Sequence, residues 1–297
     1  MLQSPIVNFT QFLRRLFFVS LRAKFLTTGF LLSLAASLAV SGQEPVKTDA
    51  PKAATPTPTP TPAPVNTKDA IKNPTAEQIA ETAIFLYGGG GGREKLKQIR
   101  RTAIERGRIT VANAEGKMEQ ARYQRWTTRG ETIGKEKIRF DQEFPTARYS
   151  LVFNEERIFG IFNDQTFTPR EDASKAFQNQ IRYGVETLLR YKESESKLEL
   201  VGREKIGGVD MHVVDVIDKQ NRKARFYISA KTFRVMMLDY EEEGTKYRRK
   251  FYDYNIAQGT LVPYRSVLYA GDKIVEEVDI GTVTYGQKID DGMYTAN

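Results

Sequence analysis

The sequence predicts an α+β fold of mainly β structure, in which helices cover one face of a large antiparallel sheet. Strand-like runs follow one another from about residue 100 to residue 285, separated by only a few Gly, Asn or charged residues. Parallel neighbours would need crossovers of a dozen or more residues, so strands joined this closely are antiparallel. A single long helical pattern, over 171–193, interrupts the strands. We expect this helix to lie across the open face of the sheet.

The composition excludes several classes of function. The chain has 297 residues, no Cys, one His and a net charge of +8. Without the four basic residues of the N-terminal targeting region, 41 basic residues remain against 37 acidic ones. This mildly basic balance is not typical of a nucleic-acid-binding protein. The lack of Cys excludes disulfides, thiolate chemistry and most zinc sites. We therefore expect no metal, no cofactor and no nucleic-acid partner.

The N-terminus has the layout of a secretory signal peptide. The apolar run Phe25–Val40 carries no charge and is followed by the small residues Ser41 and Gly42. Its basic n-region holds the four residues Arg14, Arg15, Arg22 and Lys24. We predict that residues 1–42 direct export and that cleavage yields a soluble periplasmic or otherwise exported protein. The alternative is an uncleaved inner-membrane anchor, although this apolar run is short for a spanning helix.

A linker is predicted over residues 43–72. Its segment Thr55–Pro64 has proline at almost every second position. Proline fixes φ and removes backbone donors, so such a tract favours an extended polyproline-II conformation. It would either hold the folded domain away from a membrane surface or remain a passive disordered tail. The folded domain is predicted to occupy residues 73–297.

The folded domain begins with a helix. Thr75 and Gln78 form a predicted capping box directly after Asn73-Pro74. We expect the helix to end at Gly88–Gly92 and a short helical segment to follow over Arg93–Arg101. The glycine run lacks the preceding strand and the following Gly-Lys-Ser/Thr of a phosphate loop, so we interpret it as a flexible helix end.

The strand pattern starts with a hairpin of Ile104–Asn113 and Lys117–Thr127, followed by an extended segment over Glu131–Glu143. The later strands are expected at Tyr149–Asn154, Arg157–Asn163, Val209–Asp218, Arg222–Ser229, Phe233–Tyr240, Tyr247–Ile256, Leu261–Ala270 and Ile274–Tyr285. Arg157–Asn163 is apolar on both faces, which predicts that it is covered twice or lines a cavity.

The 171–193 helix carries one apolar stripe, with Phe177, Ile181, Val185 and Leu188 at positions i, i+4, i+8 and i+11. No Ser, His or carboxylate is placed in an acid–base or nucleophile pattern, so we predict no enzymatic activity.

An acidic run and a basic run flank one predicted hairpin tip. Glu241–Glu243 precedes Gly244, and Tyr247–Lys250 leaves the turn. The first interpretation is cross-strand charge pairing. The second is that the basic run contacts anionic lipid headgroups or a lipoprotein.

Several short motifs, in their order along the chain, resemble the LolA-like family of outer-membrane lipoprotein-sorting proteins over about residues 75–294. They are Tyr87-Gly88-Gly89, Gly107, Leu200–Arg203, Gly207–Val209, Arg225–Ile228, Lys250–Tyr254, Leu261–Tyr264 and Ile289-Asp290. The family usually has a Phe shortly after the Ile-Asp, where this chain has Tyr294. The resemblance implies a curved sheet forming an incomplete barrel, with an N-terminal helix and one long internal helix covering its concave face.

The resemblance also implies a function. Such domains hold acyl chains between sheet and helices, because each buried methylene gains roughly 0.8 kcal/mol. We therefore expect an exported periplasmic carrier that binds lipid acyl chains or a lipidated protein in lipoprotein or lipid sorting, with peripheral or transient membrane contact. The alternative is an envelope protein-interaction or sensor module with a packed core and no lipid ligand.

The apolar side chains of the predicted core supply the candidate lining of such a cavity, and Met236 adds an adaptable surface to it. The candidates are Trp126, Phe140, Tyr149, Leu151, Phe153, Phe159, Ile161, Phe177, Ile181, Leu188, Phe226, Ile228, Met236 and Leu238. Each of them could instead fill a closed core.

Overall fold

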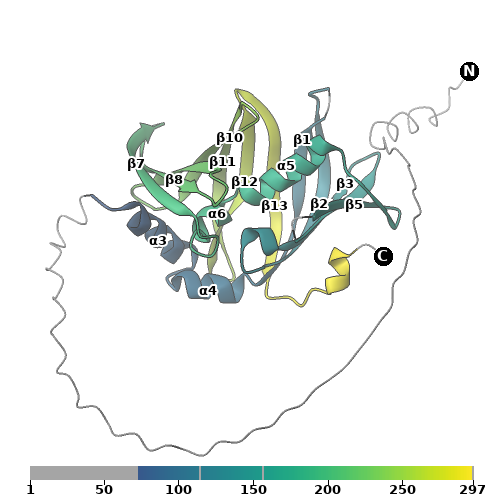
Figure 1. The fold of residues 1–297 in the computed structure, drawn as a ribbon, viewed down its shortest axis with the longest axis horizontal. Coiled ribbons are helices and arrows are strands. Elements are labelled where there is room, and N and C mark those ends of the chain that lie inside the picture. The colour runs from purple at the N-terminus through teal and green to yellow at the C-terminus, as the bar shows by residue number, and fades with distance from the viewer. Residues whose placement is uncertain (1–72, 114, 156, 296–297) are drawn as a thin grey trace, which may run out of the picture. The chain divides into compact units, whose positions relative to one another are not determined.

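The computed structural model describes residues 73–295 apart from residues 114 and 156. The predicted signal peptide (1–42) and linker (43–72) lie outside the described residues. Within them, 13 strands form one antiparallel sheet in the order β6-β5-β4-β3-β2-β1-β13-β12-β11-β10-β9-β8-β7. The sheet is curved and does not close, so the predicted mainly β fold with an incomplete barrel is confirmed. Figure 1 shows its long strands and the helices beside them.

Two meanders make up the sheet. The first contains β1 (Thr102–Ala112), β2 (Met118–Thr128), β3 (Lys137–Glu143), β4 (Arg148–Asn154), β5 (Arg157–Phe162) and β6 (Gln165–Phe167). The second contains β7 (Lys197–Ile206), β8 (Val209–Ile217), β9 (Lys223–Ser229), β10 (Val235–Glu242), β11 (Thr245–Ala257), β12 (Thr260–Ala270) and β13 (Lys273–Tyr285). β1 pairs with β13, with Ile109 opposite Val278, and this pairing joins the meanders into one sheet.

The N-terminal helix α3 (Ala76–Tyr87) forms as its capping residues predict. The Thr75 side chain accepts from the Gln78 backbone N–H, and the Gln78 side chain accepts from the Thr75 N–H. Six of its 12 residues are buried. At its end the Tyr87 hydroxyl lies 2.9 Å from the Tyr254 hydroxyl and accepts from the Val235 N–H. Burial raises the pKa of Tyr87 to about 12, so the phenol stays protonated.

The five glycines join α3 to α4 (Gly92–Ile99) by a tight turn. Gly89 has a φ of +56°, and a Cβ there would lie 2.2 Å from the Gly259 carbonyl oxygen. Only glycine fits both the backbone conformation and this close approach. The segment is therefore a helix–helix connection, and the predicted helix end is confirmed.

The prediction of one long helix over 171–193 is wrong, because the chain forms two helices there. They are α5 (Glu171–Arg182) and α6 (Val185–Leu189), and the extended residue Gly184 separates them. Tyr183 leaves the helical path and stacks on Tyr240 of β10, with ring centroids 3.8 Å apart. The contact buries both rings, so tertiary packing overrides the local helical pattern.

The sequence does not predict the two short 3-10 helices. η1 (Ile133–Lys135) occupies the start of the segment expected to be extended over 131–143, so β3 begins only at Lys137. η2 (Asp291–Tyr294) follows the sheet, with the Asp290 side chain accepting from the Gly292 N–H. Tyr294 is fully buried, and its hydroxyl lies 3.0 Å from that of Thr128 on β2.

The α-helices cover one face of the sheet, which we call the inner face. α3, α4 and α6 pack on the second meander in an assembly that we call the α3 cluster, with buried Ile79, Tyr87, Leu96, Leu188, Val214, Phe226, Leu238, Phe251 and Leu268. α5 covers the other part of the inner face in the α5 cluster, with buried Ile109, Ala121, Tyr123, Ile138, Phe140, Leu151, Phe153, Phe177 and Val278. Figure 1 shows α5 drawn across the strands and away from α3 and α4.

None of the helices between residues 73 and 295, where the structure is described, combines the length and apolarity that crossing a membrane requires.

Candidate functional site

The helix-covered inner face brings together ten of the fourteen candidate lining residues. The α5 cluster includes Phe140, Tyr149, Leu151, Phe153, Phe177 and Ile181. The α3 cluster includes Leu188, Phe226, Ile228 and Leu238. The apolar stripe of the 171–193 segment is thus divided between two clusters, because the chain turns at Gly184. A role of these residues in lipid binding stays a prediction.

The other four candidates lie on the outer face, so the prediction that all fourteen share one lining is corrected. Phe159 pairs with Val152 and Ile161 with Ser150, between the inward-facing Leu151 and Phe153. Successive strand side chains point to opposite faces, and directly paired residues share a face. Both faces of strand β5 are thus partly covered, which agrees with its apolar residues on both faces.

Trp126 lies on the outer face by the same alternation, whereas Met236 lies at a β-bulge between Val235 and Met237. Trp126 pairs with Arg139, whose guanidinium lies 5.9 Å from the indole centroid. Met236 packs in a separate outer cluster with Met211, Val213, Tyr227 and Met237.

The helix α5 is held to the sheet by few apolar contacts. Of its 12 residues, all of them described, Phe177 alone is buried. Its ring stacks on Phe140 of β3 with centroids 6.0 Å apart. At the other side of the helix, Lys175 forms ion pairs with Glu171 and with Glu243 at the β10–β11 turn. Exposed ion pairs contribute little, about 0–1 kcal/mol, so Phe177 is the main apolar anchor of α5.

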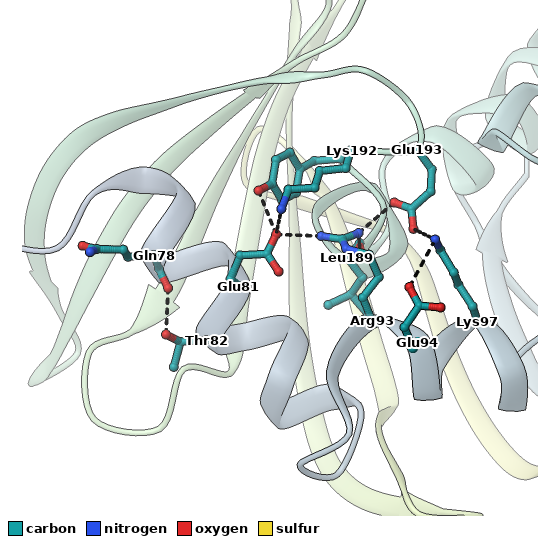
Figure 2. Close-up of polar contacts among 10 residues, drawn as sticks. Gln78, Glu81, Thr82, Arg93, Glu94, Lys97, Leu189, Lys192 and Glu193 are labelled. Atoms are coloured by element: carbon teal, nitrogen blue, oxygen red, sulfur yellow. Dashed lines mark hydrogen bonds and ion pairs between the residues drawn. The ribbon is translucent and has the colours of Figure 1, made fainter. Parts of the chain in front are cut away.

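A network of ion pairs and hydrogen bonds holds the helices α3 and α4, as Figure 2 shows. Arg93 of α4 donates to Glu81 of α3 at 2.9 Å and to Glu193, beyond α6, at 2.8 Å. Lys192 also pairs with Glu81, at 2.8 Å. Burial acts to raise the pKa of Glu81, but hydrogen bonds from Lys192, Tyr191 and Arg93 outweigh it and lower the pKa. This network, together with the buried face of α3, makes that half of the inner face a fixed core.

A belt of polar side chains separates the two apolar clusters beneath the helices. Arg249 of β11 donates through Nη1 to Glu276 of β13 at 2.6 Å, and both side chains are less than one-tenth exposed. Glu276 accepts a second hydrogen bond from the amide of Gln180 on α5. Gln180 in turn accepts from Arg125 of β2 at 2.9 Å. The belt therefore ties α5 to three strands by hydrogen bonds in a covered environment.

A second group of buried and half-buried charges lies where α6 meets the ends of the strands. Glu186 of α6 accepts from Arg100 at 2.6 Å and from Arg129 at 2.8 Å. Arg190 pairs with Glu136 and donates to the Gly130 carbonyl at 2.7 Å. Burial acts to raise the pKa of Glu186, but Arg129 and Arg100 outweigh it and lower the pKa to about 2. The paired charges show that this cluster fixes α6 in place.

Our sequence interpretation did not find the buried arginines, although a signal for Arg249 exists. Tyr247, Arg249 and Phe251 alternate along β11 and share the inner face, where Tyr247 stacks on Tyr240 and Phe251 is buried. An arginine at an apolar position of a strand indicates a buried charge. The run 248–250 is therefore not one basic strip, since Arg248 points outward and pairs with Asp239.

The outer face has a polar hollow of about 300 Å³ over β1–β4. It is lined by Arg106, Gly107, Arg122, Tyr123, Gln124, Asp141, Gln142, Glu143 and Arg148. Mixed charges surround this hollow, so it does not suit an acyl chain.

The chain resembles known proteins in its structure. No family model matches the sequence, and no curated protein matches it. A DUF1329 family protein from Desulfovibrio piger is 12% identical with a TM-score of 0.52, covering 75% of this chain and 98% of that chain. A LolA superfamily protein from Nitrosomonas europaea is 13% identical with a TM-score of 0.52, with the same coverage of 75% and 98%. The described part of the chain has the fold of LolA superfamily proteins, as the resemblance predicted.

Proposed function

We propose that this chain is an exported, non-catalytic carrier that holds the acyl chains of a lipid or lipidated protein between α5 and the inner face of β1–β4 and β13. The single observation that carries the proposal is the contrast between α5 and α3. α5 buries one side chain over an extensive apolar surface, whereas α3 buries six.

The energies favour exchange of α5 for a ligand. Burying a Phe side chain contributes about 1.5–3 kcal/mol, and each buried methylene gains about 0.8 kcal/mol. About four methylenes therefore replace the contact that Phe177 makes with Phe140 and its neighbours. A longer acyl chain also has to offset the two hydrogen bonds of Gln180, which break when α5 moves aside. A partner with a better site for the same chain would shift the population back to the closed state and release the ligand.

The proposal is tested with protein recovered after export from cells that express the full chain. Lipids are extracted from the purified protein and analysed by mass spectrometry, and uptake of a fluorescent acyl probe is titrated. A stoichiometric acyl ligand, or saturable probe uptake that unlabelled lipid displaces, is the expected result. Protein that holds no lipid and refuses the probe contradicts the proposal.

A matched pair of variants locates the site. Phe140→Ala removes the surface under α5 and should weaken probe uptake, since Phe140 is buried in the α5 cluster. Ile161→Ala lies on the outer face of the same meander and should leave uptake unchanged. Equal effects of the two variants would move the site away from α5.

A second candidate function is that of an envelope protein-interaction module. It is favoured by the edge strand β7, where Leu200 and Val201 are each 46% exposed. Exposed apolar edge strands can pair with an extended segment of another protein. Absence of acyl binding, together with a partner whose capture is lost in Val201→Lys, would support this alternative.

A further inference from the structure

We propose that Arg249 binds the acidic head group, a carboxylate or phosphate, of the amphiphile whose chains lie under α5. This inference rests on the proposed function and specifies the class of its ligand. The site is the edge of the Arg249 guanidinium that carries Nε and Nη2, in the polar belt between the two apolar clusters.

The vacant edge of Arg249 is the first observation. Its Nη1 is taken by Glu276, but its Nε and Nη2 are buried and have no hydrogen-bond partner among the described residues. Arg249 as a whole is 6% exposed. A buried donor without a partner costs about 1–3 kcal/mol, more when it is charged. Two such donors on one guanidinium mark a place where an acceptor is missing.

Two other arginines of the chain show which chemical group fits this edge of a guanidinium. Arg225 uses Nε and Nη2 to hold both oxygens of Asp215, at 2.7 and 3.0 Å. Arg248, next to Arg249, holds Asp239 in the same way, at 2.7 and 2.6 Å. This paired geometry matches a carboxylate or phosphate, in which two oxygens lie side by side. The same two atoms of Arg249 are thus arranged for an oxyanion that the described residues do not supply.

The residues around Arg249 leave a path for the head group of the ligand and an apolar surface for its tail. Gln180 of α5 bridges Glu276 and Arg125, so movement of α5 breaks both hydrogen bonds and uncovers the belt. The Nε of Arg125 is also buried without a partner in the described part of the chain. Glu276 stays paired through Nη1 of Arg249, because a guanidinium can serve two oxyanions on separate edges. The tail then lies on the α5 cluster beside the belt.

The test compares a charged probe with its uncharged analogue in the exported full-length protein. Fluorescent parinaric acid and its methyl ester are titrated at a pH well above the carboxyl pKa. The native protein should bind the acid about 10- to 100-fold more tightly than the ester, which corresponds to charge-assisted hydrogen bonds. Arg249→Lys keeps the charge but removes the paired geometry. It should lose most of this preference without weaker binding of the ester.

Two further variants guard against effects on folding. The double variant R249Q/E276Q removes both charges, so no buried carboxylate is left unpaired, and it should bind acid and ester alike. Arg248→Gln removes the neighbouring outer-face arginine and should keep the native preference. Thermal melts establish that each variant is folded. Phosphatidic acid tested against diacylglycerol distinguishes a phosphate head group from a carboxylate.

The outcomes separate this inference from the function on which it rests. Equal affinity of the native protein for charged and uncharged probes in both pairs overturns the Arg249 site but leaves acyl binding intact. The Arg249 site is also overturned if R249K or R249Q/E276Q is folded and keeps the full preference for the charged probe. Binding of no probe of either kind overturns the carrier function and the Arg249 site together.

Discussion

Phe177 of α5 stacks on Phe140 of β3, with ring centroids 6.0 Å apart and ring planes inclined by 10°. Each residue is only 2% exposed. Through this contact α5 meets the apolar surface beneath it. The rest of α5 contributes partly exposed or polar side chains. The pair is therefore the main apolar contact between α5 and the sheet.

The first prediction concerns the local stability of the helices. The amide hydrogens of α5 should exchange with solvent faster than those of α3, because α5 buries one residue and α3 buries six. Hydrogen exchange followed by mass spectrometry measures both helices in one sample. Phe177→Ala should speed exchange in α5 and leave α3 unchanged. Equal protection of the two helices in the native protein would contradict the assignment of α5 as the movable cover.

The second prediction uses Trp126, the only tryptophan of the chain. Bromine on an acyl chain quenches an indole that it contacts. Because Trp126 lies on the outer face beside Arg139, brominated fatty acid should not quench its fluorescence. The variant W126F/F140W places the only indole beneath α5, where quenching is expected. Quenching of native Trp126 would place this residue in the lipid site and contradict its position on the outer face.

The third prediction is a pH dependence that arises from Glu186. Its pKa is lowered from 4.5 to about 2 in the folded protein. A lowered carboxyl pKa stabilises the fold above the unfolded value, and this stabilisation is lost as the pH falls from about 4.5 towards 2. Glu186→Gln should therefore unfold more easily than the native protein at pH 7, and the difference should shrink below pH 4.5.

Chemical denaturation at several pH values measures this difference. Glu77→Gln, at the first turn of α3, is the control, because it removes a carboxylate outside the Glu186 cluster. A difference between native protein and Glu186→Gln that stays constant from pH 7 to pH 2 would show that the arginines do not hold the Glu186 charge.

The fourth prediction compares two phenylalanines from opposite faces. Phe226→Ala should lower the free energy of unfolding by about 3–5 kcal/mol, because the side chain is completely buried in the α3 cluster. Phe159→Ala should cost clearly less, because Phe159 is only partly buried on the outer face of β5. Urea titrations give both values. A cost for Phe159 as large as that for Phe226 would mean that the outer face is a second closed core.

Local signals in the sequence predicted most of the elements correctly. The Thr75–Gln78 capping box, the glycines that end α3 and the hairpin of β1 and β2 all appear in the structure. The predicted strand Tyr149–Asn154 forms as β4, and its Leu151 and Phe153 share the inner face. These features depend on residues within a few positions of each other, where periodicity and capping act.

Apart from the local 3-10 turn η1, the wrong or missing predictions involve contacts between distant parts of the chain. The helix over 171–193 ends at Arg182, and the next residue, Tyr183, stacks on the distant Tyr240. Trp126 is as apolar as the inner residues, yet its strand register places it on the outer face. The uniform basic run at 248–250 separates into an outward Arg248 and a buried Arg249, whose partner Glu276 lies on another strand.

The sequence by itself thus determined the antiparallel strand pattern, the first helix and the supply of apolar residues for an inner face, because each follows from short-range periodicity and turn chemistry. Only the tertiary structure decided which residues share that face, how loosely α5 covers it and that Arg249 keeps a vacant edge beneath. The physical reason is that burial and hydrogen-bond satisfaction are set by strand register and helix packing, which join residues far apart in the chain.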